Sequence, residues 1–297
     1  MLDYRIDTFL EVCRFMNFTK AAQSLNITQP AVSQHIKYLE EQYHTTFFVF
    51  RGKKMELTEE GKVFLNSART FRHDEMYLRK QLEEAGKEQE AVIFGATLTI
   101  GDFVLPDLIR RLTAENPQVS IFMEIGNTGE LLEKLNAGQI DFAVVEGYFE
   151  KEAYEYRRWS KEKFILAASP DYSFQNPPAK IRDLFGERLI VREKGSGTRE
   201  VLEKNLQTQN FSIFNFSRRH EISSLHVIKS LIEAGCGITF LYEAAVWKEL
   251  KKGTLVEVPL DDFQIYHDFN FVWRKGSIFS EKYEAFYHDL QKMGGIR

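Results

Sequence analysis

The sequence predicts an α/β protein of several domains, in which a winged helix-turn-helix is joined by a long helix to a two-lobed α/β domain. Three observations predict this class. Apolar residues recur every three or four positions over 4–39, good helix formers continue over 58–90, and short apolar strands alternate with amphipathic helices after residue 91. The expected domains are the winged helix-turn-helix at 1–58, the linker helix at 59–90 and the two-lobed domain at 91–297, with lobe I at about 91–162 and 267–297 and lobe II at about 163–266.

The composition is that of an ordinary globular protein, and its charge sets a condition on any nucleic-acid contact. The 297 residues include 39 Lys and Arg against 43 Asp and Glu, a net charge of −4, so DNA would have to contact a local basic surface. Cys13 and Cys236 lie far apart in a Cys-poor chain, which favours a reducing compartment and no disulfide. The acidic N-terminus does not suit a signal peptide, and no window approaches about 18 uninterrupted apolar residues. We therefore expect a cytoplasmic protein without a membrane partner.

The first 39 residues predict three short helices. Thr19 is expected to cap the second helix, and Asn26-Ile27 to end it. Thr28 is expected to cap the third, with Pro30 in its first turn, where a missing N–H group costs nothing. The very short break makes the second and third helices cross steeply, which is the helix-turn-helix arrangement.

A wing and a long helix are expected next. Residues 47–50 and 55–57 read as two strands around the basic turn 51–54, and Thr58 caps a helix that continues to about Glu90. A strict four-three spacing on this helix indicates a seam against a partner helix. The seam positions are Phe64, Ala68, Phe71, Glu75, Leu78, Leu82 and Ala85.

The C-terminal pattern predicts βαβ units with a mostly parallel sheet. The expected strands are 92–96, 119–125, 140–145, 164–167, 189–191, 238–241 and 268–273. The expected helices are 102–115, 130–137, one that begins at Arg199, 223–234 and 280–292.

One face of the third helix suits contacts with DNA bases. Val32, Ile36 and Leu39 fall on the buried side, and the opposite side and its flank are polar. Gln pairs with adenine, Ser with several base edges and Lys with guanine or a phosphate, while a helix start offers N–H groups to a phosphate. An ordinary solvated helix face carries the same residue types, so this pattern alone leaves both readings open.

Residues 17–40 read NFTKAAQSLNITQPAVSQHIKYLE. The pieces F-T-x-A-A, T-Q-P-A-V-S and I-x-x-L-E, with Leu57-Thr58-Glu59-Glu60-Gly61 at the linker start, closely resemble the LysR-type transcriptional regulators. The resemblance covers the layout of the whole chain. It implies a winged helix-turn-helix, a dimerising linker helix and a two-lobed effector domain similar to periplasmic binding proteins. The implied partners are double-stranded operator DNA, RNA polymerase, a small-molecule effector and further copies of the chain in a homodimer or homotetramer.

The wing departs from the family pattern. Tyr43-His44 replaces the usual Leu-Gly, and Phe50 replaces an Arg that commonly contacts a phosphate. Basic residues of the wing turn are the expected substitutes. The expected DNA-binding residues are Thr28, Gln29, Pro30, Ser33, Gln34, Lys37, Arg51, Lys53 and Lys54.

Three segments that lead into helices suggest an effector site. The segments 97–101, 127–129 and 195–199 bring hydroxyls and free N–H groups to positive helix ends, which suits an oxyanion or an organic acid. Arg199 could pair such an anion bidentately, whereas plain N-capping by Thr128 and Thr198 is the alternative. His226 suits either a donor or a packing residue. With the contacts that the family resemblance implies in the cleft between the lobes, the expected effector residues are Thr97, Thr99, Ile100, Asn127, Thr128, Ser196, Gly197, Thr198, Arg199 and His226.

Signals for an enzyme are weak. The sequence contains no P-loop, nucleophile elbow, H-E-x-x-H or paired C-x-x-C motif, and its seven His residues have no metal-binding spacing. We therefore expect no catalysis, cofactor or metal. Two other classes remain open: a solute-type binding protein without DNA-binding activity and, less favoured, an enzyme that uses Ser196 or Thr198.

Overall fold

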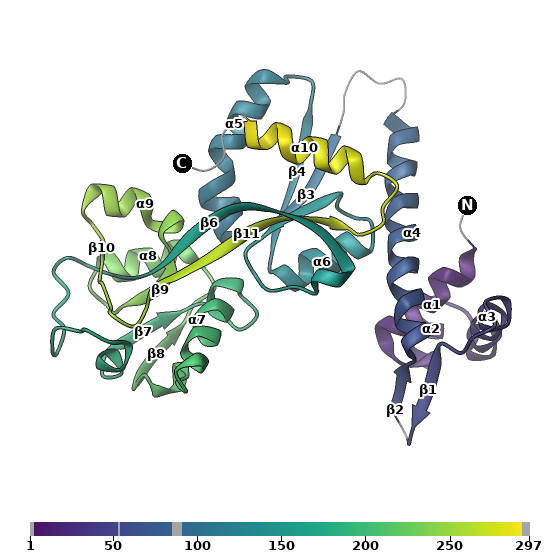
Figure 1. Ribbon diagram of the computed structural model, residues 1–297, viewed down its shortest axis with the longest axis horizontal. Coiled ribbons are helices and arrows are strands. Elements are labelled where there is room, and N and C mark those ends of the chain that lie inside the picture. Colours follow the sequence, from purple (N-terminus) through teal and green to yellow (C-terminus); the bar gives the residue numbers. More distant parts are fainter. Residues whose placement is uncertain (1–2, 53, 85–90, 293–297) are drawn as a thin grey trace.

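The computed structural model describes residues 3–52, 54–84 and 91–292. A small helical head at one end is joined by a long helix to an elongated domain of two lobes (Figure 1). The head contains α1 (Tyr4–Phe15), α2 (Phe18–Ser24), α3 (Gln29–Gln42), β1 (Phe48–Arg51) and β2 (Lys54–Leu57), and α4 (Glu59–Glu84) is the linker helix. This arrangement confirms the predicted winged helix-turn-helix and linker helix.

Side-chain caps set the helix starts in the head. Thr28 accepts a hydrogen bond from the Ala31 amide at 3.3 Å, as predicted. The cap of α2 is Asn17, whose Oδ1 accepts from the Lys20 amide at 2.9 Å, so the prediction of Thr19 was wrong. An Asn side chain is the stronger cap, and choosing it moves the helix start back by two residues, with Thr19 inside the first turn.

The linker helix is held partly by its own head and partly by lobe I. Phe64 and Ala68, the first two seam residues, are buried in the core of the head, where Phe64 stacks on Phe47 at 4.3 Å between ring centroids. The seam prediction was therefore wrong for these two positions, because they pack within the chain. Phe71, Leu78 and Leu82 are 45%, 45% and 67% exposed. Ala85 lies outside the described residues.

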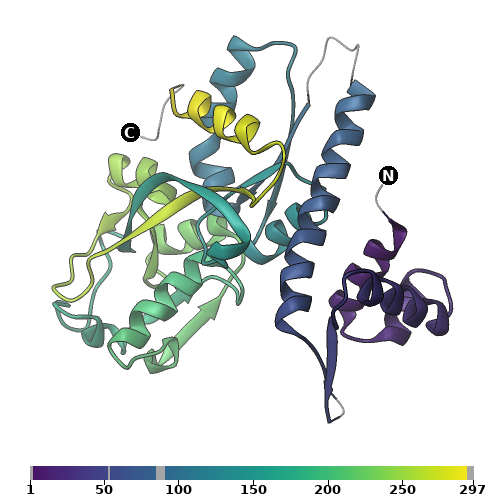
Figure 2. The ribbon, with the colours of Figure 1, turned by 45° about the vertical axis from the view of Figure 1, so that its right-hand side comes forward.

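Lobe I is built on a short parallel βαβ arrangement. Its strands are β3 (Ala91–Thr97), β4 (Ser120–Gly126) and β5 (Phe142–Val145), and its helices are α5 (Leu105–Glu115), α6 (Thr128–Asn136) and α10 (Ser280–Lys292). The predicted helix over 102–115 is preceded by a π-helical turn, η1 (Ile100–Val104), that runs directly into α5. Figure 2 shows α4 running along this lobe.

Lobe II contains the remaining elements. Its helices are α7 (Gly197–Thr208), α8 (Leu225–Glu233) and α9 (Glu243–Lys252), and its strands are β7 (Arg188–Val191), β8 (Arg218–Glu221), β9 (Thr239–Tyr242) and β10 (Val256–Glu257). Strands β7 and β8 pair in parallel. The interiors of both lobes are apolar and rich in aromatic side chains.

Two long strands join the lobes and correct the predicted sheet. The chain passes between the lobes in β6 (Tyr154–Ala168) and β11 (Ile265–Arg274), which pair antiparallel from Ile265 opposite Phe164 to Arg274 opposite Tyr154. The expected strand 164–167 is the end of β6. Among the described residues, the seven-stranded sheet has two parallel pairings, β3–β4 and β3–β5, and the others are antiparallel. The sheet is therefore mixed, and the prediction of a mostly parallel sheet was wrong.

Candidate functional site

The exposed start of α3 carries the predicted base-contacting side chains. Gln29 Nε2 donates to Ser33 Oγ at 2.8 Å, so in the free protein these two side chains satisfy each other. Gln29 and Ser33 line a groove of about 460 Å³ together with Met16, Asn17, Phe18, Phe50 and Met55. Thr28, Pro30, Gln34 and Lys37 are exposed beside it. The wing and recognition helix therefore form one surface.

The cations near this surface are weakly held. Arg51 and Lys54 lie 3.6 and 3.4 Å from the carboxylate oxygens of Glu56, and Lys37 lies 3.6 Å from Glu41. The three cations are highly exposed, and ion pairs of exposed cations contribute little, so each cation can turn to a phosphate. Lys53, the remaining predicted contact, lies outside the described residues.

The three predicted helix starts converge between the lobes on Glu146 and Gly147, which follow β5. Thr198 Oγ1 donates to Glu146 Oε1 at 3.0 Å, and Thr99 Oγ1 lies 3.4 Å from Thr198 Oγ1. A Cβ on Gly147 would lie 2.3 Å from Thr128 Oγ1, and one on Gly197 would lie 2.9 Å from Glu146 Cγ. Both glycines are therefore required for this close approach.

Several polar atoms of this interlobe site are buried without a partner. Among the described residues, hydrogen-bond partners are lacking for Thr97 Oγ1, Thr128 Oγ1, Ser196 Oγ, Glu146 Oε2 and Arg192 Nη1. Buried polar groups are normally satisfied, and an unsatisfied one costs about 1–3 kcal/mol. Three hydroxyls, a guanidinium and a carboxyl in one place are a donor and acceptor set that a small polar ligand could satisfy.

Glu146 has an unusual protonation equilibrium. Burial raises its pKa to about 7, and the opposing effects of hydrogen bonds from Thr99 and Thr198 and of the Arg192 charge are smaller. Near neutral pH both forms of the carboxyl are populated. The site can therefore present either an acceptor or a donor at this position.

The structure also shows which of the predicted effector residues cap helices and which do not. Asn127 forms a capping box with Glu130, so Thr128 is free of the capping role, and Thr198 donates to Glu146 instead of capping α7. The capping alternative for these two threonines was wrong. Ile100 is buried in the core of lobe I and Gly197 lies against Glu146.

Arg199 and His226 are not placed as predicted. Arg199 Nε and Nη1 donate to Glu203 at 2.8 Å and Glu221 at 2.6 Å, so its own chain provides the bidentate partners that an effector was expected to supply. His226 is largely exposed, with Nε2 3.9 Å from Asp102 Oδ2. Glu146 and Arg192 were missed by the sequence analysis. The available signal was a charged residue directly after a short buried strand in each case.

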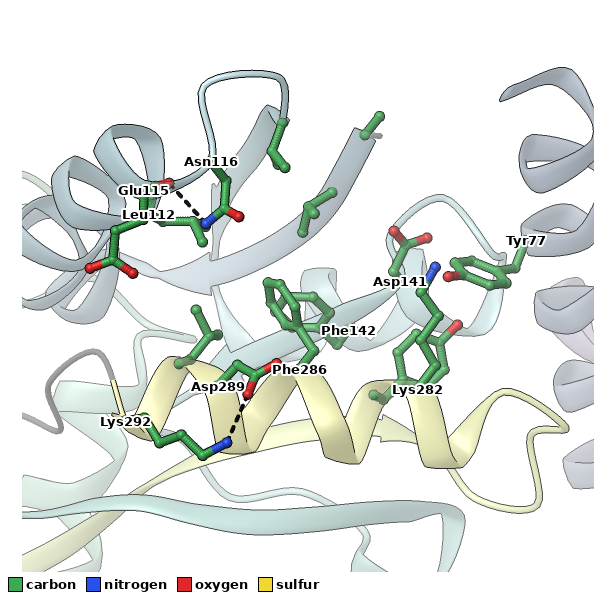
Figure 3. Close-up of a pocket in the computed structure, with 15 residues that line it drawn as sticks. Tyr77, Leu112, Glu115, Asn116, Asp141, Phe142, Lys282, Phe286, Asp289 and Lys292 are labelled. Atoms are coloured by element: carbon green, nitrogen blue, oxygen red, sulfur yellow. Dashed lines mark hydrogen bonds and ion pairs between the residues drawn. The ribbon is translucent and has the colours of Figure 1, made fainter. Parts of the chain in front are cut away.

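A separate cavity of about 500 Å³ lies between α4, α5 and α10 (Figure 3). Phe142 and Phe286 lie in its apolar part, and Asp289 pairs with Lys292 on α10 at 3.1 Å. None of the predicted effector residues lines it.

The raised pKa of Glu146 predicts a pH-dependent stability. The pKa of Glu146 rises from 4.5 to about 7 on folding, so between these pH values the folded protein holds a proton that the unfolded chain has lost. The folded state therefore loses stability as the pH rises from 4.5 to about 7. At 1.36 kcal/mol per pH unit, Glu146→Gln should gain about 3 kcal/mol relative to wild type between about pH 4 and pH 8. Urea denaturation at both pH values measures the difference. An equal effect of the substitution at both would contradict the assigned pKa.

A winged helix-turn-helix joined by a long helix to a two-lobed domain with a polar interlobe site defines a ligand-responsive DNA-binding regulator. Residues 4–62 match the family model described as "Bacterial regulatory helix-turn-helix protein, lysR family", and residues 85–294 match "LysR substrate binding domain". The chain therefore belongs to the LysR family of transcriptional regulators. This assignment decides against the solute-binding alternative.

Curated relatives agree with the family, and solved structures agree with the fold. The chain is 30% identical over 261 residues to the uncharacterized HTH-type transcriptional regulator MJ0300 of Methanocaldococcus jannaschii, covering 87% of this chain and 88% of that one. It is 28% identical to the HTH-type transcriptional regulator CysL of Bacillus subtilis, over 90% and 89% of the two chains. The fold matches ArgP of Mycobacterium tuberculosis with a TM-score of 0.64 at 16% identity, covering 100% and 98% of the chains. It also matches full-length LysG of Corynebacterium glutamicum with bound effector Arg, with a TM-score of 0.63 at 19% identity over 99% of both.

The described part of the chain offers neither a membrane span nor a metal-binding cluster. Within residues 3–52, 54–84 and 91–292, no helix is long and apolar enough to cross a membrane. In the same part of the chain, no cluster of three or more His, Cys, Asp or Glu residues could hold a metal ion. Cys13 and Cys236 are both free thiols.

Proposed function

We propose that this regulator binds a two-fold operator in the cytoplasm as a homodimer or homotetramer and responds to a small oxyanion or organic acid held between the two lobes. The observation that carries the proposal is the group of unpartnered buried hydroxyls, with Arg192, where three segments that lead into helices converge. Helix starts favour negative charge, and Arg192 keeps one donor there, Nη1, that is free among the described residues, while its Nε and Nη2 donate to Glu193. An effector in this position contacts both lobes at once.

The regulator would respond to the effector because the effector binds two arrangements of the protein with unequal affinity. A ligand shifts an equilibrium between two arrangements only by the difference between its affinities for them. Ser196 and Arg192 belong to lobe II, whereas Thr97 and Thr128 belong to lobe I, so a ligand satisfying all four favours one relative position of the lobes. Through α4, that position would set the spacing of two recognition helices on DNA and the contact with RNA polymerase.

Calorimetry against a panel of small oxyanions and organic acids tests the effector site. We expect wild type to bind at least one member, and Ser196→Ala and Thr128→Val each to weaken binding about tenfold, because each removes a hydroxyl donor worth about 1.4 kcal/mol. Thr208→Val, which removes an exposed hydroxyl of α7, is the matched control. The proposal fails if no member binds, or if Ser196→Ala and Thr128→Val bind as tightly as the control.

The DNA surface has its own test, a gel shift on the upstream intergenic DNA and on scrambled DNA. Gln29→Ala and Ser33→Ala should cost about 1–3 kcal/mol on the operator and little on scrambled sequence, because their side chains contact bases. Lys54→Ala should weaken both complexes alike. It should also reduce the slope of the logarithm of affinity against the logarithm of salt concentration by about one. Lys248→Ala on α9 is the control. Equal losses on both DNAs for all three head variants would refute these roles.

A further inference from the structure

The carboxyl group of Glu146 lies where the proposed effector site would otherwise favour an anion. It is 2% exposed, and its Oε1 accepts from Thr198 while its Oε2 has no partner among the described residues. The starts of α6 and α7 approach it closely through Gly147 and Gly197. Glu146 is thus part of the wall that any ligand of this site must touch.

A buried carboxylate restricts which anions can bind beside it. An ionised Glu146 repels a fully ionised oxyanion, and the low dielectric of a closed site strengthens that repulsion. One proton between the two groups converts the contact into a strong hydrogen bond. The proton can come from the ligand, in which case Oε2 accepts, or from a protonated Glu146, which then donates.

We propose that Glu146 is a specificity-determining residue, which makes this regulator select small oxyanions that carry a hydrogen-bond donor, such as hydrogen phosphate or a hydroxy acid, over isosteres without one. This inference rests on the proposed function, in which an anion binds between the lobes. The donors of Thr97, Thr128, Ser196 and Arg192 hold the ionised part of the ligand, and Glu146 accepts from its protonated part.

Three other ionisable side chains lie close to Glu146 or to its neighbour Tyr242. Arg192, after β7, is paired with Glu193, to whose carboxylate oxygens its Nε and Nη2 donate at 2.8 Å each. Tyr242 on β9 interacts with Glu146, and burial raises its pKa well above 10, so it stays neutral. His267 on β11, whose Nδ1 lies 3.1 Å from Tyr242 Oη, has a pKa lowered below 6.5 by burial and is neutral above that value. Titration of the site around neutral pH is therefore assigned to Glu146.

Two pairs of probes test the selection by calorimetry. Hydrogen phosphate and sulfate have the same tetrahedral shape, but only the first carries a proton at about pH 8, and glycolate and acetate differ by one hydroxyl. At about pH 8 wild type should bind the donor-bearing member of a pair at least about tenfold more tightly. Near pH 6 this ratio should shrink, because the protonated Glu146 then donates to either anion.

The variant Glu146→Gln tests whether the carboxyl group of Glu146 causes the preference for donor-bearing anions. The amide can donate to both members of a pair at any pH, so the preference should fall to near one at both pH values. Glu150→Gln, which removes an exposed carboxyl four residues away, should keep the wild-type ratio. Circular dichroism checks the fold, and if Glu146→Gln does not fold, the pH dependence of the wild-type ratio decides alone.

The outcomes distinguish the inference from the function beneath it. Equal wild-type affinity within each pair at about pH 8, or a preference that Glu146→Gln retains, overturns the role of Glu146 and leaves the effector site intact. Wild type that binds none of the four probes but binds another panel member lacking a donor also overturns it. No binding across the whole panel overturns the proposed function itself.

Discussion

Arg274→Ala is expected to cost about 3–5 kcal/mol of folding stability, because it leaves several hydrogen-bond acceptors without their donor and removes a large buried side chain. The Arg274 side chain is 0% exposed at the end of β11. Nη2 donates to Asn66 Oδ1 at 2.6 Å and to Thr70 Oγ1 at 3.1 Å, and Nη1 donates to Asn136 Oδ1 at 2.8 Å. Truncation leaves these acceptors, two of them only part-buried, without their donor and adds a cavity.

The same substitution should loosen the linker helix from the effector domain. Asn66 and Thr70 lie on α4, whereas Asn136 ends α6 of lobe I, so Arg274 ties the two together. Asp74, one turn further along α4, accepts from Ser277 Oγ at 2.6 Å and from the Ile278 amide at 2.9 Å. This contact keeps part of the attachment. We therefore expect effector-dependent changes in DNA binding to weaken more than DNA binding itself.

Urea denaturation and a gel shift with and without effector measure the two effects. Arg157→Ala is the matched control, since Arg157 lies opposite Phe271 of the same strand pair but forms a half-exposed ion pair with Glu284. Exposed pairs contribute about 0–1 kcal/mol. Similar losses of stability in the two variants would show that the buried guanidinium does not hold α4 to lobe I.

The head was predictable because its signals are local. The three-four spacing of Phe9, Val12 and Phe15, the Thr28 cap and Pro30 all act within one or two turns. The misplaced cap of α2 moved one helix boundary by two residues and left the order of the three helices as predicted. Sequence periodicity is strong where helix formation depends on neighbours in the chain.

The joined lobes were less predictable because their contacts are distant in sequence. Strand β6 pairs with β11 about a hundred residues later, and its polar half, which includes Lys161 and Lys163, does not read as a central strand. The helix starts at 97–101 and 127–129 were predictable because βα connections bring such ends to one edge of a sheet. The start at 195–199 belongs to a different sheet, and only the family resemblance placed it with them in a cleft between the lobes. Glu146 was missed because a carboxyl after a short strand normally faces solvent, and only the packing of both lobes buries it.

The second large effect is expected on the exposed part of the linker seam. Replacing Leu78 and Leu82 together by Glu should convert the proposed dimer of linker helices into separate helices, because the charges would face their own copies across the seam. These side chains and Phe71 are exposed in the single chain, whereas Phe64 and Ala68 below them are already covered. The part of the seam that can contact a partner helix therefore runs from Phe71 to Leu82, toward the C-terminal end of α4.

Loss of that contact should reduce operator affinity by at least about 100-fold. A single head contacts one half-site, whereas in a dimer the first bound head holds the second at a high effective concentration near the other half-site. Sedimentation measures the assembly, and the gel shift measures the affinity. Val63→Glu places the same charge on an exposed apolar position of α4 that is off the seam, so it should leave both unchanged. If the double variant sediments like wild type, contacts other than this seam hold the copies together. A double variant that sediments as a dimer but loses the operator would instead show that α4 sets the spacing of the heads within an assembly held by the effector domains.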